Sequence, residues 1–370
     1  MNRKFLLACY EVPGYGGAST AAYQLLQQMR RSGLDVSFLN LIDEQDAEYF
    51  RYTFGEHFGN PARLQHIYNC ILGEPLYAPH PGLADLIAGI QPDVLIGEDF
   101  IAALLLKRAF PSAPLVFYTS GSLLMKDAIE RNEIKDFLAQ ERTILKSAGR
   151  PVVPPNEELE AIDLSSLVIA NSDMVAMLHR HYYPFHACKI YSDVLWKAEW
   201  IYDEAASFSA FKKPFRQRDI DVLFIASSWE RRDKNFPMLK KIASGLKDAS
   251  VHVVGGTEEY LPSVTHHELI TRQENLFRLM GDAKTVVCPS LCDAAPGVLF
   301  EASALGCNVV TSKNAGNWRL CNEQLLANEF TSGEFVRKIR FSLSRKFQDH
   351  MDYFLQANSY QKLIDVLSVI

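Results

Sequence analysis

The sequence predicts an α/β fold made of two Rossmann-like domains that face each other. Short apolar strands alternate with amphipathic helices, a pattern typical of parallel sheets with helices on both faces. The alternation breaks over residues 193–218 and then starts again. The chain also has 370 residues, which is more than one compact core usually holds. Each uninterrupted series therefore predicts one domain.

The first series begins with an apolar strand that ends in a glycine-rich turn. A helix follows, with apolar residues on one face from Ala18 to Met29 and an end at Gly33. Residues 44–78 have weak periodicity, so no element is predicted there. Further helices are predicted at 83–90, 100–110 and 173–181, and strands at 5–10, 36–41, 93–96, 115–118 and 167–170.

The break at 193–218 is rich in charged and aromatic residues, which is typical of a segment that crosses between domains. The second series then resumes the pattern of the first. Strands are predicted at 222–226, 251–254, 286–288 and 308–310, and helices at 236–245, 298–305 and in the C-terminal region. Ligands of such parallel sheets bind at the carboxyl ends of the strands, so motifs at these ends are the candidates for function.

Composition excludes several classes of protein. A formal net charge of −6 argues against a general nucleic-acid binder, which needs concentrated Lys and Arg. The longest apolar runs are too short to span a membrane, and the N-terminus reads as a strand, although peripheral membrane contact stays open. The seven cysteines are scattered without metal-site spacing, as expected of free thiols in the cytoplasm.

The segment 286–312 carries the clearest chemical motif. A buried strand ends at Pro289 and places Asp293 in a loop at its carboxyl edge. Pro296 and Gly297 then begin a helix, whose free backbone N–H groups and positive dipole end suit a pyrophosphate. Glu301 lies one turn into this helix and can accept hydrogen bonds from two vicinal ribose hydroxyls. Taken alone, either acid is more simply a turn or surface residue.

This segment resembles the signature of family 4 glycosyltransferases, in which two carboxylates eight positions apart flank a glycine-containing turn. The resemblance implies that Glu301 holds the ribose of a nucleotide-sugar donor. It also implies that Asp293 contacts the transferred sugar, where the family usually has Glu. The remaining donor contacts would come from the turn and the start of the helix, at Ala295, Pro296, Gly297 and Val298.

Residues 227–235 resemble the strand–loop of the same family that carries an Arg and a Lys. Lys234 matches the family Lys and would neutralise the charge that builds on the leaving group. Ser228 stands where the family has its Arg. Arg231 and Arg232 lie three and four residues later, and either can bind the donor phosphates.

Residues 14–19 resemble the glycine turn of the family that reaches over the donor phosphates or the acceptor. Gly16 and Gly17 are the candidates for this contact. The same glycines leave a second function open, because they also fit part of a dinucleotide-binding fingerprint. Ser19 stands where that fingerprint needs a third glycine, while Asp43 can serve as its acid. A nucleotide-dependent oxidoreductase is therefore the main alternative.

The stretch 92–122 resembles the family segment in which a His contacts the transferred sugar. Ser120 occupies the His position and can donate a hydrogen bond, but it cannot carry the charge of an imidazolium. A catalytic role for Ser120 is one interpretation. The other is a non-catalytic binding protein that keeps the fold.

Two apparent metal motifs are better explained as a domain-entry turn and as ordinary surface residues. Asp219 and Asp221 precede a strand, whereas a metal-binding Asp-x-Asp follows one. The pair His266 and His267 lies near Pro262 without further ligands. No metal or cofactor is therefore expected.

The resemblance as a whole implies a GT-B fold, with two Rossmann-like domains facing across a cleft. Residues 1–200 would form the acceptor-side domain and 201–345 the donor domain, and 346–370 would be a helix that returns to the first domain. The implied activity is that of a hexosyltransferase that uses a nucleoside-diphosphate sugar, with retention and without metal. The acceptor is unidentified, with a surface polysaccharide or a glycolipid as candidates, and nucleic acid is not a partner.

Overall fold

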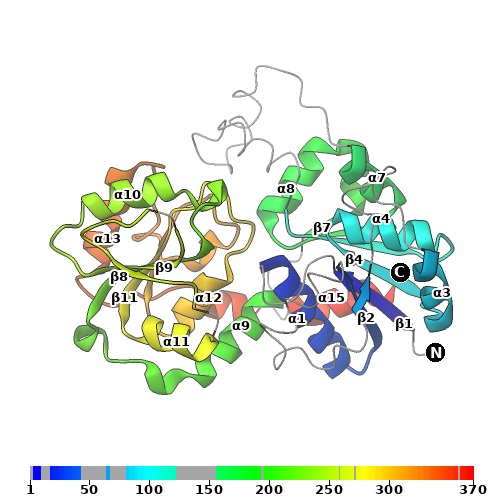
Figure 1. The fold of residues 1–370 in the computed structure, drawn as a ribbon, viewed down its shortest axis with the longest axis horizontal. Coiled ribbons are helices and arrows are strands. Elements are labelled where there is room, and N and C mark those ends of the chain that lie inside the picture. The colour runs from blue at the N-terminus through cyan, green and yellow to red at the C-terminus, as the bar shows by residue number, and fades with distance from the viewer. Residues whose placement is uncertain are drawn as a thin grey trace. The chain divides into compact units, whose positions relative to one another are not determined.

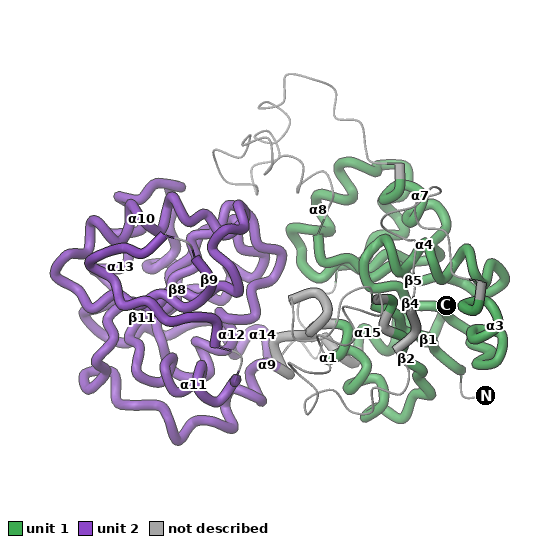
Figure 2. The backbone as a smooth tube through the Cα atoms, viewed as in Figure 1, with its two compact units in different colours: residues 1–123, 153–193, 360–370 green, residues 124–152, 194–359 purple. Residues whose placement is uncertain are grey.

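A computed structural model describes residues 3–9, 17–42, 64–66, 81–121, 156–192, 196–257, 259–270, 272–356 and 359–370. The chain divides into two compact units (Figure 2). Unit 1 comprises residues 1–123, 153–193 and 360–370, and unit 2 comprises 124–152 and 194–359. The residues predicted as one C-terminal helix are divided between the units, and the predicted boundary at residue 200 lies inside a helix of unit 2.

Unit 1 is built on a seven-stranded parallel sheet with the order β3-β2-β1-β4-β5-β6-β7 (Figure 1). Its strands are short and, where their burial is described, mostly buried, as expected for a sheet covered by helices on both faces. They are β1 (Lys4–Cys9), β2 (Asp35–Ile42), β3 (Leu64–His66), β4 (Val94–Glu98), β5 (Leu115–Thr119), β6 (Leu167–Ala170) and β7 (Ile190–Ser192).

The described helices of unit 1 lie between its strands in sequence, except the last, which follows unit 2 near the C-terminus. They are α1 (Gly17–Arg31), α3 (Pro81–Ile90), α4 (Phe100–Ala109), α7 (Asn156–Leu164), α8 (Asp173–Tyr182) and α15 (Ser359–Ser368). The end of α15 is joined to the start of the chain, because the Arg3 guanidinium donates to the Ser368 carbonyl at 2.9 Å.

Unit 2 contains a five-stranded parallel sheet with the order β10-β9-β8-β11-β12. Its strands are β8 (Ile220–Ser228), β9 (Val251–Gly256), β10 (Thr265–His267), β11 (Ala283–Cys288) and β12 (Asn308–Thr311). Its helices are α9 (Trp196–Ser207), α10 (Phe236–Ser244), α11 (Gln273–Gly281), α12 (Gly297–Ala304), α13 (Ser332–Ser342) and α14 (Met351–Gln356). The predicted α/β class with two parallel sheets is confirmed.

Every strand predicted from the sequence is present, but several elements were missed. Helix α9 lies within the predicted crossing segment, where charged and aromatic residues hide its periodicity, and Ile201 and Ala205 are its described buried residues. Strand β10 has three polar residues at the edge of its sheet and thus no apolar signal. Helices α7 and α11 and strand β7 were also missed.

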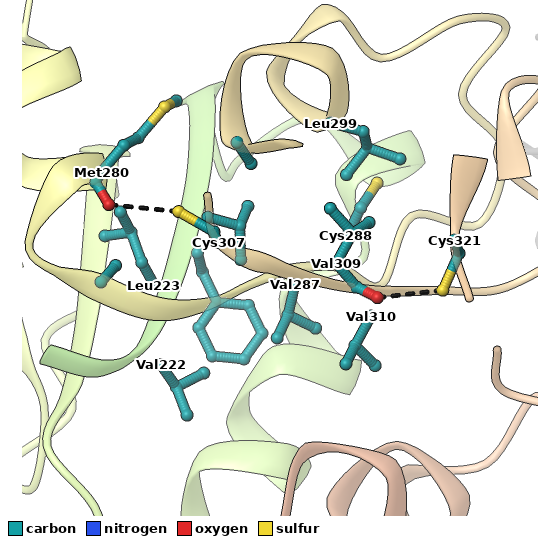
Figure 3. Packing of buried hydrophobic residues seen from close by; sticks show 14 of the residues in the cluster. Val222, Leu223, Met280, Val287, Cys288, Leu299, Cys307, Val309, Val310 and Cys321 are labelled. Atoms are coloured by element: carbon teal, nitrogen blue, oxygen red, sulfur yellow. Dashed lines mark hydrogen bonds between the residues drawn. The ribbon is translucent and has the colours of Figure 1, made fainter. Parts of the chain in front are cut away.

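The cysteines of unit 2 are part of its apolar core. The Cys307 thiol donates to the Met280 carbonyl at 3.1 Å, and the Cys321 thiol donates to the Val309 carbonyl at 2.9 Å (Figure 3). Burial raises the pKa of Cys307, and it raises that of Cys321 to about 12. These thiols are therefore packing residues and not nucleophiles.

The two apparent metal motifs have structural roles. Asp221 lies at the amino end of β8, where its carboxylate accepts from the Ser250 amide at 2.9 Å and pairs with Lys284 at 2.7 Å. His266 Nε2 accepts from the Leu261 amide at 2.8 Å. Among the described residues, no group of three or more His, Cys, Asp or Glu is placed to hold a metal ion. None of the described helices is both long and apolar enough to cross a membrane.

A histidine pair joins the edge strand β10 to its neighbour β9 in unit 2 and predicts acid sensitivity. His252 Nδ1 on β9 lies 3.0 Å from His267 Nε2 on β10, so one ring donates to the other. Burial lowers the pKa of both histidines, and a second histidine adds to this, His267 at His252 and His266 at His267. As the pH falls, these two histidines bind protons at a higher pH in the unfolded chain than in the folded chain. We therefore expect the free energy of unfolding to decrease as the pH falls below about 6.5.

Urea unfolding monitored between pH 8 and pH 5 measures this effect, and His267→Gln is the diagnostic variant. Glutamine keeps a donor and an acceptor but does not titrate, so the acid loss should be smaller in H267Q than in the wild type. The variant H350Q removes an exposed histidine paired with Glu323 and is the control. Equal pH profiles for the wild type and H267Q would exclude the histidine pair as the cause.

Candidate donor-binding site

The candidate site lies at the carboxyl ends of β8 and β11, which are neighbours in the sheet of unit 2. The loops after these strands are joined by two hydrogen bonds. The Leu291 amide donates to the Asp233 carbonyl at 2.8 Å, and Asn235 Nδ2 donates to the Pro289 carbonyl at 3.0 Å. Two segments that the sequence singled out separately, 227–235 and 286–301, thus form one site.

Lys234 and Asp293 are the centre of this site. They are 59 positions apart in sequence, yet Lys234 Nζ lies 2.6 Å from Asp293 Oδ2. The carboxylate of Asp233 is 3.4 Å from the same ammonium group. Burial lowers the pKa of Lys234, but the attraction of Asp293 and Asp233 outweighs this and raises the pKa overall. Lys234 is therefore a fixed positive charge at neutral pH.

The backbone on both sides of Asp293 is held by the loop that follows β12. The Asp293 amide donates to the Asn314 carbonyl at 2.9 Å, and the Gly316 amide donates to the Asp293 carbonyl at 2.8 Å. Asp293 and Ala315 form a parallel bridge in this way. The carboxylate is thus presented from a backbone segment that behaves like a short extra strand.

Helix α12 begins three residues after Ala294, with Pro296 at its N-cap and no side chain that caps it. The first amides of a helix have no acceptor within the helix, so those of Gly297 and Val298 can receive an anionic ligand. A side chain at Gly297 would place its Cβ 3.2 Å from Ile201 Cδ1 of α9. Glycine therefore allows α9 to pack closely beside the start of α12.

Glu301 lies on α12 and is partly buried. Burial raises its pKa to about 7, and the nearby carboxylate of Glu204 on α9 contributes in the same direction. Within the described part of the chain, no hydrogen bond to the Glu301 carboxylate is formed. An acid of this kind gains from a ligand that donates hydrogen bonds, as a ribose diol does.

The two arginines of the loop have different surroundings. Arg231 makes two bonds to Asp233, with Nε at 3.1 Å and Nη2 at 2.9 Å. Arg232 is exposed and begins a short 3-10 helix that ends at Lys234. Asp233 therefore binds both Arg231 and Lys234. Arg231 and Arg232 both remain predicted ligands of the donor phosphates.

The remaining predicted residues belong to unit 1. Gly17 is the first residue of α1, and Gly16 lies outside the described residues. Ser120 follows directly after β5 and is partly exposed. The Thr119 hydroxyl beside it donates to the Gly121 carbonyl at 2.6 Å, which fixes the turn. Ser120 is thus at the carboxyl edge of its sheet, where ligands of doubly wound sheets bind.

Several residues of the site were missed by sequence reasoning. Asn235 adopts a left-handed conformation with φ of 62°, which Asn tolerates better than most residues. Its position directly before a helix was a usable signal. Glu204, Asp233 and Asn317 had none, because their importance depends on contacts with residues distant in sequence.

Comparisons with known proteins are consistent with this geometry. Residues 219–345 match the family Glycosyl transferases group 1. A search of curated proteins gives no match. Solved structures with a similar fold include HepE from Anabaena in complex with UDP and glucose, with a TM-score of 0.64, 15% identity and 99% of each chain covered.

Two further structures show how widely this fold is used. A glycosyltransferase from Rickettsia africae has a TM-score of 0.65 at 12% identity, covering 99% of this chain and 98% of its own. A UDP-GlcNAc 2-epimerase from Methanocaldococcus jannaschii has a TM-score of 0.54 at 13% identity, covering 99% of this chain and 100% of its own. The chain therefore has the GT-B fold of these solved structures, and its residues 219–345 match the group 1 glycosyltransferase family.

Proposed function

We propose that the protein transfers a hexose from a nucleoside-diphosphate sugar to an acceptor, and that unit 2 binds the donor. The observation that carries this proposal is the ion pair between Lys234 and Asp293, placed beside the uncapped start of α12. A cation, a row of free amides and a carboxylate match the pyrophosphate and the hydroxyl groups of such a donor.

Each residue has a separate role in this proposal. Lys234 has three N–H donors, so it can bind Asp293 and a phosphate oxygen at once and offset the charge of the departing diphosphate. Asp293 accepts a hydrogen bond from the transferred sugar. Glu301 accepts from the ribose hydroxyls, and one of Arg231 and Arg232 contacts the phosphates.

Finer parts of the proposal rest on the resemblance to family 4 glycosyltransferases. They are retention of configuration at the sugar carbon, transfer without a metal ion, a contact from Gly16 and Gly17 to the donor, and a hydrogen bond from Ser120 to the sugar. We also propose a cytoplasmic location, because the cysteines in the described residues are free thiols, which suits a reducing compartment. The acceptor class stays open.

A thermal-shift comparison of UDP, GDP, ADP and NAD, with and without EDTA, tests the donor site. One nucleoside diphosphate should raise Tm, because a ligand at a hundred times its Kd stabilises the folded state by about 2.7 kcal/mol. The rise should persist in EDTA and disappear in E301A. Stabilisation by NAD alone would instead support an oxidoreductase.

Incubation with the sugar donor of that nucleotide then separates an enzyme from a binding protein. Release of the nucleoside diphosphate, by transfer or by slow hydrolysis, is expected for a glycosyltransferase. Binding without any turnover, in the presence of mixed sugar and lipid acceptors, would favour the non-catalytic alternative that Ser120 suggests.

A further inference from the structure

Asn317 lies directly after the loop that holds Asp293 in unit 2. Its side chain is 1% exposed, and Nδ2 donates to the Pro296 carbonyl at 2.9 Å. Its other side-chain atom, Oδ1, is buried and has no hydrogen-bond partner among the described residues. The acceptor oxygen of a buried amide is thus unused, which costs stability and calls for a compensating role.

The segment 314–317 contacts both ends of the turn between Asp293 and Pro296. At one end, backbone bonds from Asn314 and Gly316 hold Asp293. At the other end, the side chain of Asn317 holds the Pro296 carbonyl. That carbonyl also accepts from the Leu299 amide at 3.2 Å, within the first turn of α12. The Asn317 side chain therefore adds a direct bond between the loop that holds Asp293 and the start of α12.

We propose that Asn317 is a positioning residue for the donor. It fixes the start of α12 so that the first amides of this helix and the Asp293 carboxylate can contact the same ligand. This inference rests on the proposed function, since it concerns the same site. Asparagine suits this position because its side chain carries an uncharged N–H donor that is long enough to reach the Pro296 carbonyl. Pro296 itself has no N–H group, so the turn lacks one backbone donor that could otherwise fix it.

The variant N317L tests this role, because leucine is similar in size to asparagine but cannot donate. Isothermal titration with UDP, or with GDP or ADP if one of these stabilises the wild type, gives the Kd. We expect N317L to fold, to keep its Tm within a few degrees of the wild type, and to bind the nucleotide about tenfold more weakly. The KM for the matching sugar donor should rise by a similar factor.

Asn308 provides a matched control. It is 1% exposed in the same unit, and its Nδ2 donates to the carbonyls of Ser342 and Arg345 at 2.6 and 2.8 Å, away from the donor turn. The variant N308L should lower Tm and leave the nucleotide Kd unchanged. If N317L does not fold, N317A takes its place, because alanine removes the N–H donor without adding a charge.

Measurements on the wild type and E301A distinguish a failure of this inference from a failure of the proposed function. If the wild type binds a nucleotide, E301A weakens binding and N317L does not, Asn317 has no positioning role. If N308L weakens binding as much as N317L, the effect is general loss of stability and the inference is overturned. If the wild type binds no nucleoside diphosphate, the proposed donor site itself is rejected, and the role of Asn317 with it.

Discussion

Replacing Lys234 with alanine is expected to reduce kcat for sugar transfer by a factor of about 10² to 10³, the cost of removing one charge-stabilising donor from an active site. The variant loses the cation that offsets the charge of the leaving diphosphate. It also leaves Asp293, which is 16% exposed, without the ammonium group that lies 2.6 Å away in the wild type. An unpaired carboxylate in this position should repel the phosphates, so the KM of the donor should rise as well.

Steady-state kinetics with the donor identified by thermal shift measures this effect. Lys240 supplies the matched control, because it pairs with Glu259 at 2.9 Å on the exposed surface of the same unit. We expect K240A to retain wild-type kinetics. The double variant K234A/D293N should regain stability relative to K234A but not activity. A K234A enzyme with wild-type kcat would remove Lys234 from the mechanism.

Replacing Glu301 with glutamine is expected to weaken nucleotide binding and at the same time to stabilise the protein at pH 8. Burial and Glu204 raise the pKa of Glu301 from 4.5 to about 7, so the folded state prefers the protonated form. The resulting contribution to stability is present below pH 4.5 and is lost as the pH rises through 7. Glutamine does not titrate, so E301Q should gain at most about 3 kcal/mol at pH 8.

Binding should have the opposite pH dependence, because the carboxylate is the better acceptor for ribose hydroxyls. Titrations of the wild type and E301Q with UDP from pH 6 to pH 8.5 give the Kd of E301Q divided by the Kd of the wild type. The ionisation of UDP itself cancels in this ratio. The ratio should grow as the pH rises through about 7. The variant E204Q should shift this change to lower pH, whereas E274Q, at an exposed position, should not. A ratio independent of pH would show that Glu301 does not titrate in this range.

Much of the fold was readable because its signals are local. Most of the apolar strands of both sheets, and several helices with a clear apolar face, were found from periodicity alone. Helix α9 was missed because charged and aromatic residues are interspersed along it, and β10 because an edge strand of three residues has no buried side to reveal. Both elements are defined by their neighbours and not by their own composition.

In the candidate site, too, sequence reasoning finds residues with a local signal and misses those defined by distant contacts. The motif residues Lys234, Asp293 and Glu301 were each identified from sequence, and the contact between the first two is visible only in the structure. Asn317 carries no motif at all, since its single bond is made to a residue 21 positions away. Sequence reasoning thus found the charged residues that belong to a motif, but not Glu204, Asp233 or Asn317.

The loops after β11 and β12 are joined by backbone groups on both sides of Asp293, in the bridge between Asp293 and Ala315. Main-chain bonds of this kind do not depend on which side chains the loops carry. This part of the site can therefore be kept while neighbouring side chains are exchanged one at a time. Such a division makes unit 2 a favourable starting point for laboratory evolution toward other sugars or bases, with Ala294, Ala295 and Val298 as the positions to randomise first.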